Sequence, residues 1–184
     1  MAMIVCVRTC YAPYEPTRSW SIRPRPPGAG GVHRHVAVQL VDWVTEKHPA
    51  VPVDRDAVLL GAALHDVGKV LHPAELTGPG SAHELAGYQL LVDRGVPAAA
   101  AVIARDHASW SSGSTVECLL VSLADKVWKD KRVDDLEQLV VDRIVAGTGE
   151  AGWAVFAGLD DELSAIGAQA VRRLAFQNSF SAGS

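Results

Sequence analysis

Apolar residues recur every three or four positions along most of the chain, which is the spacing of helices that bury one face. The first such segment, HRHVAVQLVDWVTEKH, places Val36, Leu40 and Val44 on one side, and two prolines soon afterwards end it. The sequence has no internal repeat and no alternation of polar and apolar residues long enough for a strand. The pattern therefore predicts an all-α protein, a compact bundle of about six to eight helices.

Capping residues and prolines divide the rest of the chain into further helices. Asp54 suits the N-cap of the second helix, and Ser81 that of the third, which follows a loop rich in proline and glycine. Ser114, with Glu117 three residues later, has the spacing of a capping box. After the first helix, the predicted helical segments are residues 55–66, 82–94, 97–108, 114–130, 134–146 and 159–176, with a short helical piece in 150–158.

The two ends of the chain lack this helical pattern. Residues 1–31 end in RPRPPGAGG, where proline and glycine exclude a helix or a central strand, and we expect a leader that is extended or partly disordered. The polar tail, residues 178–184, is expected to fray. Between them, residues 32–177 are expected to form one helical domain.

Composition and charge narrow the classes of function. A chain of 184 residues, 48% of them hydrophobic, can bury one sizeable core. The formal net charge of -4 gives no general attraction to a nucleic-acid polymer or to an anionic membrane, so we expect neither as a partner and predict no particular oligomeric state. The chain has no run of about eighteen apolar residues and no secretory signal pattern, which predicts a cytoplasmic location. Its three cysteines, Cys6, Cys10 and Cys118, are no disulfide framework.

Two charged positions interrupt apolar helical runs. The segment LLGAALHDVGKVLHP brings His65 and Asp66 side by side into the last turn of a helix, where a buried charge is costly unless it has a partner. Asp125 likewise interrupts the apolar face of SLADKV and needs a cation or hydrogen-bond donors. The neighbouring Lys126 points about 100° away around that helix.

Histidines and carboxylates recur on several separate helices, and in a helical bundle such side chains can converge on a metal ion. Imidazole nitrogen and carboxylate oxygen without thiolate suit Mn, Fe, Co, Ni, Zn or Mg rather than a structural zinc cluster. His48, at the end of the first helix, is expected to be solvated. The candidate ligands are His33, His35, His65, Asp66, His83, His107 and Asp125.

The order of these residues resembles the HD-domain superfamily of metal-dependent phosphohydrolases, which is all-helical. The segment LHDVGK is similar to the most recognisable motif of that family, and HELAGYQLL resembles the corresponding helix of its HD-GYP branch. The segments ARDHASW and SLADKV resemble the helices that supply the last histidine and the last aspartate. The resemblance covers roughly residues 32 to 130. It implies an HD-type helical domain and a hydrolase that uses divalent metal ions.

The resemblance also implies a ligand set. His65, Asp66 and Asp125 would bind one metal ion, and His35 would complete its ligands, because RHVAVQLV resembles the usual opening of the family's first helix. His33 lies roughly 200° around the helix from His35, so the two cannot both point inward.

Dinuclear members of the family bind a second metal ion through the intermediate histidines, while the aspartate of the pair bridges the two ions. Because His83 and His107 are both present, two metal ions per chain are the favoured expectation. If only one ion binds, His83 or His107 could instead serve as a general acid.

Such a site suits hydrolysis of a phosphomonoester or phosphodiester by metal-activated hydroxide, on a nucleotide-like or other small phosphorylated molecule. Asp66 and Lys69 are the predicted catalytic residues, with Lys69 holding a nonbridging phosphate oxygen. Arg105 and Lys129 are further candidates for substrate binding. The Gly-Tyr-Pro triplet of the HD-GYP branch is absent, so its cyclic dinucleotide substrate is not expected here.

Two other functions remain open at the level of sequence. Some helical proteins with the same order of ligands hold a mixed-valent di-iron centre and activate dioxygen. A non-catalytic module that binds a nucleotide is the second alternative, and the complete ligand set argues against it.

Overall fold

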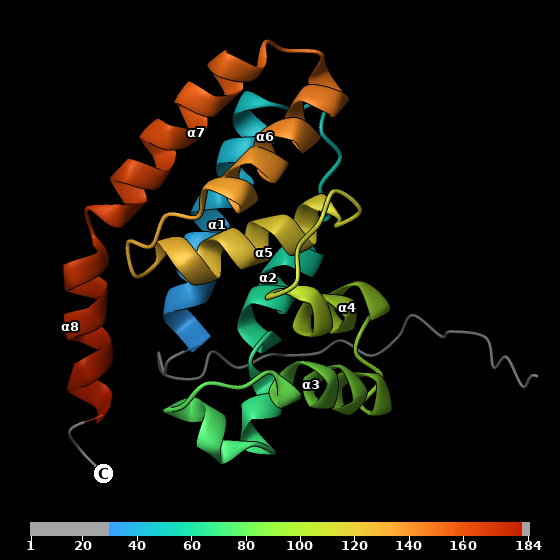
Figure 1. Cartoon of the computed structure of the whole chain (residues 1–184), viewed down its shortest axis with the longest axis vertical. Coiled ribbons are helices and arrows are strands. Elements are labelled where there is room, and N and C mark those ends of the chain that lie inside the picture. Colours follow the sequence, from blue (N-terminus) through green and yellow to red (C-terminus); the bar gives the residue numbers. More distant parts are fainter. Residues whose placement is uncertain (1–29, 182–184) are drawn as a thin grey trace, which may run out of the picture.

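The computed structural model describes the backbone of residues 30–181 and the side chains of residues 34–175, and this part of the chain contains helices and no strand (Figure 1). The all-α prediction is confirmed. The predicted leader, apart from its last two residues, and the end of the predicted tail lie outside the described residues, as do Cys6 and Cys10. The elements are α1 (Gly30–Lys47), α2 (Arg55–Leu64), η1 (Val67–Val70), η2 (Pro73–Leu76), α3 (Ala82–Asp93), α4 (Ala98–Asp106), α5 (Val116–Val127), α6 (Asp134–Thr148), α7 (Gly152–Gly167) and α8 (Ala170–Ser181), where η marks a 3₁₀-helix.

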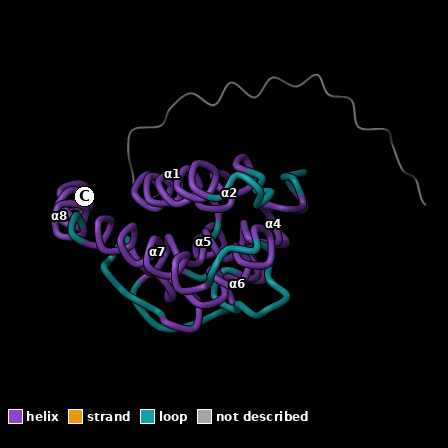
Figure 2. Tube along the Cα trace, turned by 90° about the horizontal axis from the view of Figure 1, so that it is seen from above, coloured by secondary structure: helices purple, strands orange, loops and turns teal. Residues whose placement is uncertain are grey.

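Helix α5 forms the centre of the molecule. Figure 2 shows it between α1 and α2 on one side and α6 and α7 on the other, and it contacts all four. Nine of its twelve residues are buried, and Leu120 and Leu123 have no exposed surface. The hydroxyl of Ser122, the one hydroxyl or charged side chain among these nine buried residues, donates to the carbonyl oxygen of Cys118 at 2.7 Å and so has a hydrogen-bond partner. Because packing holds α5 on every side, the residue at position 125 has a fixed location.

A second, smaller apolar cluster joins α3 and α4 to the end of α2. Leu91, Ala101 and Ala104 are its buried members. Small side chains let these helices approach closely: a Cβ at Gly61 of α2 would lie 2.7 Å from Ile103 Cδ1 of α4. The C-terminal ends of α2 and α4 are thereby brought together.

The N-terminal caps only partly follow the prediction. The carboxylate of Asp54 accepts a hydrogen bond from the amide of Ala57 at 3.0 Å, as expected of the N-cap of α2. Helix α5 begins one residue later than predicted, since Thr115 rather than Ser114 is its N-cap. Glu117 does not complete a capping box but accepts from the backbone amide of Asp54 at 3.0 Å. This carboxylate therefore joins α5 to the start of α2.

The segment predicted as one helix over residues 159–176 is divided between α7 and α8, which follow one another along one side of the molecule (Figure 1). The buried guanidinium of Arg173 holds the corner, donating to the carbonyl oxygen of Ile166 at 2.7 Å and to that of Trp128 at 3.2 Å. Gly167 is also required, because a Cβ there would overlap the carboxylate of Asp130. The interruption thus results from contacts with the end of α5, which helical spacing alone does not reveal.

His48 is not solvated as predicted. It is 6% exposed, its Nδ1 lies 2.7 Å from Glu150 Oε1, and its ring packs edge-on against Trp43. The prediction failed because the partner carboxylate is 102 residues away in the sequence.

The described helices include none with both the length and the apolar content needed to cross a bilayer.

Gly68 of η1 meets the backbone of α3 at a separation that only glycine permits. A Cβ at position 68 would overlap the carbonyl oxygen of His83 and lie 2.6 Å from the amide nitrogen of Gly87. Both neighbours are backbone atoms, so they cannot give way by changing a rotamer. Gly68 and Gly87 therefore set how closely the turn after Asp66 approaches α3.

The Gly68→Ala variant should lower the free energy of unfolding by about 1–3 kcal/mol, the usual cost of overpacking a tight contact. Urea denaturation followed by circular dichroism measures this change. The matched Gly113→Ala variant places its Cβ at an ordinary 3.6 Å from Ser111 Oγ, and its change should stay within about 0.5 kcal/mol. Equal losses in both variants would contradict the close approach at Gly68.

Candidate metal centre

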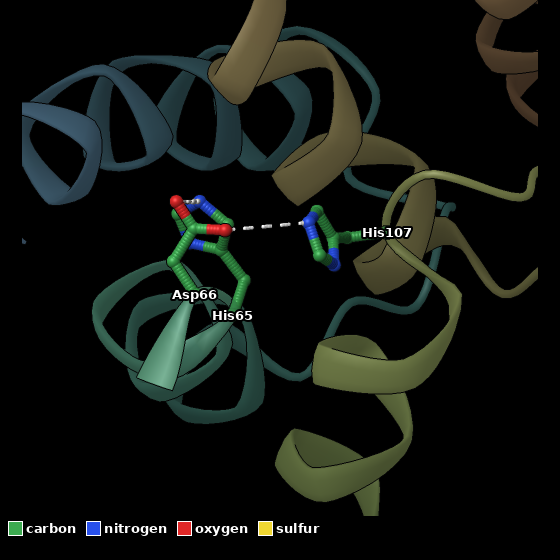
Figure 3. Close-up of side chains that lie close together, drawn as sticks. All are labelled: His65, Asp66 and His107. Atoms are coloured by element: carbon green, nitrogen blue, oxygen red, sulfur yellow. Dashed lines mark ion pairs between the residues drawn. The ribbon is translucent and has the colours of Figure 1, made fainter. Parts of the chain in front are cut away.

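His65 and Asp66 occupy the junction between α2 and η1. Helix α2 ends at Leu64, two residues earlier than predicted, so that His65 is its C-cap and Asp66 precedes η1. Asp66 makes no capping hydrogen bond to the 3₁₀ turn that it opens, although an aspartate in that position commonly does. Its carboxylate points instead toward the histidines, as Figure 3 shows for His65 and His107.

Three imidazole rings from different elements face the carboxylate of Asp66. Oδ2 lies 3.6 Å from Nε2 of His65. Oδ1 lies 3.3 Å from Nε2 of His83, in the first turn of α3, and 3.7 Å from Nε2 of His107, the C-cap of α4. All three rings are buried, with 2–6% of each residue exposed. One potential ligand atom each from His65, Asp66 and His107 lies within 4.8 Å of the others, and these three residues, which we name the metal-binding group, could together hold a metal ion.

The other ring nitrogen of each histidine is held from behind. Nδ1 of His65 lies 2.9 Å from the carbonyl oxygen of Ala62, and Nδ1 of His107 lies 3.1 Å from that of Ala104. Nδ1 of His83 lies 2.5 Å from the carboxylate of Glu75. Because carbonyl and carboxylate oxygens only accept, each Nδ1 carries a proton, and each ring turns its Nε2 toward Asp66. Histidines that bind metals in proteins are oriented in this way.

The centre suits a cation because electron-rich atoms face one another in it. Nε2 of His83 is buried and meets no hydrogen-bond donor in the described part of the chain, yet it lies 3.3 Å from a carboxylate oxygen. Burial alone would raise the pKa of Asp66, but His65 and Lys69 outweigh it and lower the pKa, so the carboxylate is ionised. A divalent metal ion would satisfy both the nitrogen and the oxygen.

Asp125 extends the centre from α5. Its Oδ1 lies 3.7 Å from Nε2 of His65, and its Oδ2 lies 2.7 Å from Nζ of Lys126. Burial would raise the pKa of Asp125, but His65 and Lys126 hold it far below the usual range. The structure thus brings together His65, Asp66, His83, His107 and Asp125, all predicted as ligands.

Two lysines form ion pairs with the carboxylates of Asp66 and Asp125. Nζ of Lys69 is 2.7 Å from Oδ2 of Asp66, and its predicted contact with a phosphate oxygen stays a prediction. Sequence reasoning missed Lys126, because the 100° between neighbouring helical positions describes the Cα–Cβ bond and not the reach of a four-carbon side chain. Its Nζ also lies 5.7 Å from the ring centre of Trp110, a residue 16 positions earlier whose proximity the sequence does not reveal.

The remaining predicted site residues lie elsewhere. His35 is exposed and is outside the group formed by His65, Asp66 and His107, because α1 turns the fully buried Val36 and Ala37 inward. Its role as a ligand stays a prediction, and the side chain of His33 lies outside the described residues.

Arg105 and Lys129, two of the three cations predicted to bind substrate, already have partners. The guanidinium of Arg105 pairs with both carboxylate oxygens of Asp106, at 2.7 and 2.8 Å, and Nζ of Lys129 lies 4.5 Å from the ring centre of Trp128. No contact with the metal-binding group is seen for either side chain among the described residues, and their part in substrate binding stays a prediction.

Comparison with known protein families finds one match, to the family described as HD domain, over residues 34–129. The match covers more than half of the chain, from the second turn of α1 to just beyond α5. The five converging residues all lie within it, whereas α6, α7 and α8 lie beyond it. No curated protein and no solved structure gave a match.

The pKa values of the neighbouring buried histidines His65 and His107 are shifted in opposite directions. Burial, together with the charge of His65, lowers the pKa of His107 from 6.5 to about 4. Burial alone would also lower the pKa of His65, but the carboxylates of Asp125 and Asp66 outweigh it and raise the pKa. His107 is therefore neutral at pH 7, which is the form that binds a metal.

Metal-free protein should lose stability as the pH falls from about 6.5 to about 4. In this range the unfolded chain takes up a proton at His107 that the folded chain refuses, so the free energy of unfolding decreases. The raised pKa of His65 acts at higher pH, where its contribution is lost as the pH rises above about 6.5. Urea denaturation in chelator at several pH values should show a shallower slope for His107→Gln than for the wild type; equal slopes would contradict the assignment.

Proposed function

The chain belongs to the HD domain family, and from that premise we propose that it hydrolyses a phosphomonoester or phosphodiester bond in a small phosphorylated molecule. Proteins of this family are generally metal-dependent phosphohydrolases. The observation that carries the proposal is the convergence of three imidazole Nε2 atoms on the carboxylate of Asp66. Hydrolase, rather than oxygenase or inactive binding module, is the function that the whole site supports best.

The two carboxylate oxygens of Asp66 face different histidines, and this arrangement supports two metal subsites. Oδ2 faces His65, which also adjoins Asp125, and these three residues form what we name the first subsite. Oδ1 faces His83 and His107, which with Asp66 form the second subsite. A carboxylate with one oxygen on each side suits a bridging role, which supports two divalent ions per chain, with Mn, Fe, Co, Ni or Zn as candidates and Mg as a further one.

Divalent ions bound there would supply the Lewis acidity that makes water a nucleophile at neutral pH. The chain itself supplies cations for the phosphoryl group. Lys69 and Lys126 each lie 2.7 Å from one ligand carboxylate, and both ammonium groups are partly exposed, with 25% and 19% of the side chain accessible. Once a metal ion neutralises these carboxylates, the lysines can turn to nonbridging phosphate oxygens and offset their charge.

These lysines also distinguish the candidate reactions. Hydrolysis of a phosphate ester requires positive charge beside the metal ions, because the substrate arrives as an anion. Oxygen activation at a di-iron centre has no such general need. Two lysines on two ligand carboxylates therefore favour the hydrolase over the oxygenase.

Purified wild-type protein should contain divalent metal and hydrolyse generic phosphomonoesters or phosphodiesters, releasing their alcohol equally well with and without oxygen. The Asp66→Ala variant removes the shared carboxylate and should lose both metal and activity. Elemental analysis and an assay of the released alcohol, each run aerobically and anaerobically, measure these outcomes. Two irons with turnover that needs oxygen, and no hydrolysis of either class of ester, would overturn the hydrolase proposal.

The Lys69→Gln variant should keep its metal content, while kcat/KM for phosphate release falls about 100-fold through loss of a charge that faces the phosphoryl group. Lys47→Gln is the matched control. Lys47 lies in the last turn of α1, outside the metal-binding group, and its variant should behave like the wild type. Steady-state kinetics with metal analysis separates the two effects. Unchanged kinetics in Lys69→Gln would remove this lysine from the reaction.

A further inference from the structure

We propose that Glu75 is the positioning residue of the second metal subsite, and that it acts by fixing the proton and the orientation of the His83 ring. This inference rests on the proposed metal-dependent function and adds to it a residue outside the ligand set. Glu75 lies in η2, within the segment that the sequence pattern predicted only as a loop.

Glu75 differs from the residues around it. Helix η2 has no buried residue, and its flanking Ala74 and Leu76 are exposed, Leu76 by 66%. The side chain of Glu75 is nevertheless only 12% exposed. A carboxylate on a surface turn gains nothing from losing water unless donors replace it. The donors come from the start of α3.

Three N–H groups converge on the Glu75 carboxylate. Oε1 accepts from the amide of Ala82 at 3.1 Å, and Oε2 accepts from the amide of His83 at 3.2 Å. Oε2 also lies 2.5 Å from Nδ1 of the His83 ring. Glu75 thus replaces the predicted N-cap Ser81, whose side chain makes no capping hydrogen bond. The positive end of the helix dipole further favours an anion at this place.

His83 needs such an outside partner because of its position in α3. His65 and His107 each lie at the end of a helix, and the carbonyl oxygen three residues earlier in the same helix accepts from Nδ1. His83 is the second residue of its helix, and the residue three positions earlier, Gly80, precedes α3. No helical carbonyl is available behind the ring, so its orientation depends on a side chain from another element.

The loop before α3 packs closely against the Glu75 side chain. A Cβ at Gly80 would lie 2.5 Å from Cδ and Oε1 of Glu75. The carboxylate therefore packs directly against the backbone of the loop that enters α3, with His83 on its other side. This contact fixes Glu75 as well as the ring.

The consequence is different for the two metal subsites. With the proton held at Nδ1, Nε2 of His83 faces Oδ1 of Asp66 as a lone pair, 3.3 Å away. If the proton moved to Nε2, the ring could not offer Nε2 to a metal ion beside Asp66. The first subsite, formed by His65, Asp66 and Asp125, has no contact with Glu75 among those described. Loss of the Glu75 carboxylate should therefore weaken one subsite and spare the other.

The Glu75→Gln variant tests this selectively. Glutamine has the same shape and keeps one oxygen for the backbone amides of α3, but its NH₂ group can donate to Nδ1 of His83 and so favours a proton on Nε2. In equilibrium dialysis with Mn²⁺ alone, the wild type should bind two ions and the variant one, with Kd for the second ion raised about 10- to 100-fold. Glu117→Gln is the matched control, because its carboxylate also accepts from a backbone amide but lies away from His83, and it should bind two ions.

A second measurement does not depend on metal binding. In metal-free protein, ¹⁵N NMR of the imidazole nitrogens should show His83 protonated at Nδ1 in the wild type and in Glu117→Gln, and shifted toward Nε2–H in Glu75→Gln. If Glu75→Gln does not fold, Glu75→Asp carries the test, since it keeps the charge but moves it about one methylene away from the ring and should give an intermediate Kd.

A Glu75→Gln variant that binds the second Mn²⁺ as tightly as the wild type, or that keeps the wild-type His83 tautomer, would overturn the inference. If the wild type itself binds no Mn²⁺ or other divalent ion, the proposed function fails, and the NMR comparison still decides whether Glu75 sets the His83 proton. The two failures are thus distinguishable.

Discussion

The structure depends on one arrangement, a carboxylate surrounded by the Nε2 atoms of three imidazole rings. Oδ1 and Oδ2 of Asp66 lie 3.3 to 3.7 Å from the Nε2 atoms of His65, His83 and His107. A carboxylate oxygen repels an imidazole lone pair at these separations unless a proton or a cation lies between them, so burying these groups without a metal ion is costly. The lysine at position 69 offsets part of this cost by pairing with Oδ2. A divalent ion would offset more of it, which is why a metal is expected to stabilise the fold as well as to serve in the reaction.

Helix ends make this arrangement possible. His65 follows the last residue of α2 and His107 the last residue of α4, and each ring is held by a carbonyl of its own helix. Bringing the two helix ends together requires small residues, and Gly61 opposite Ile103 provides the space. Gly68 then lets the turn that carries Asp66 meet the backbone of α3. Small residues therefore shape the site by letting neighbouring elements approach closely, and they contribute no chemical group to it.

The amount that could be predicted from sequence follows from how local each feature is. Helices with apolar residues every three to four positions were predictable. The convergence of His65, Asp66 and Asp125 was expected from the resemblance to the HD-domain superfamily, and charges within apolar runs indicated only that each needs some partner. Glu75 was missed, since a carboxylate in a loop rich in glycine and proline looks like an ordinary surface residue. The interruption between α7 and α8 depends on Arg173, whose carbonyl acceptors at the end of α5 are 45 and 46 residues away. Contacts between distant segments leave no periodic signal.

The helices beyond the HD domain match still bear on the centre, because they hold the end of α5. The guanidinium of Arg173 donates to the carbonyl oxygens of Val127 and Trp128 at the C-terminal end of α5, where the helix supplies no further amide donors of its own i→i−4 series. Arg132, just after that end, pairs with the buried carboxylate of Glu137 at 2.9 and 2.7 Å and with a second carboxylate on α7. Asp125 lies two residues before Val127, so these two arginines restrain the last turn from which its carboxylate reaches His65. The C-terminal helices thus contribute to the site by keeping one candidate ligand at a fixed distance from the other four.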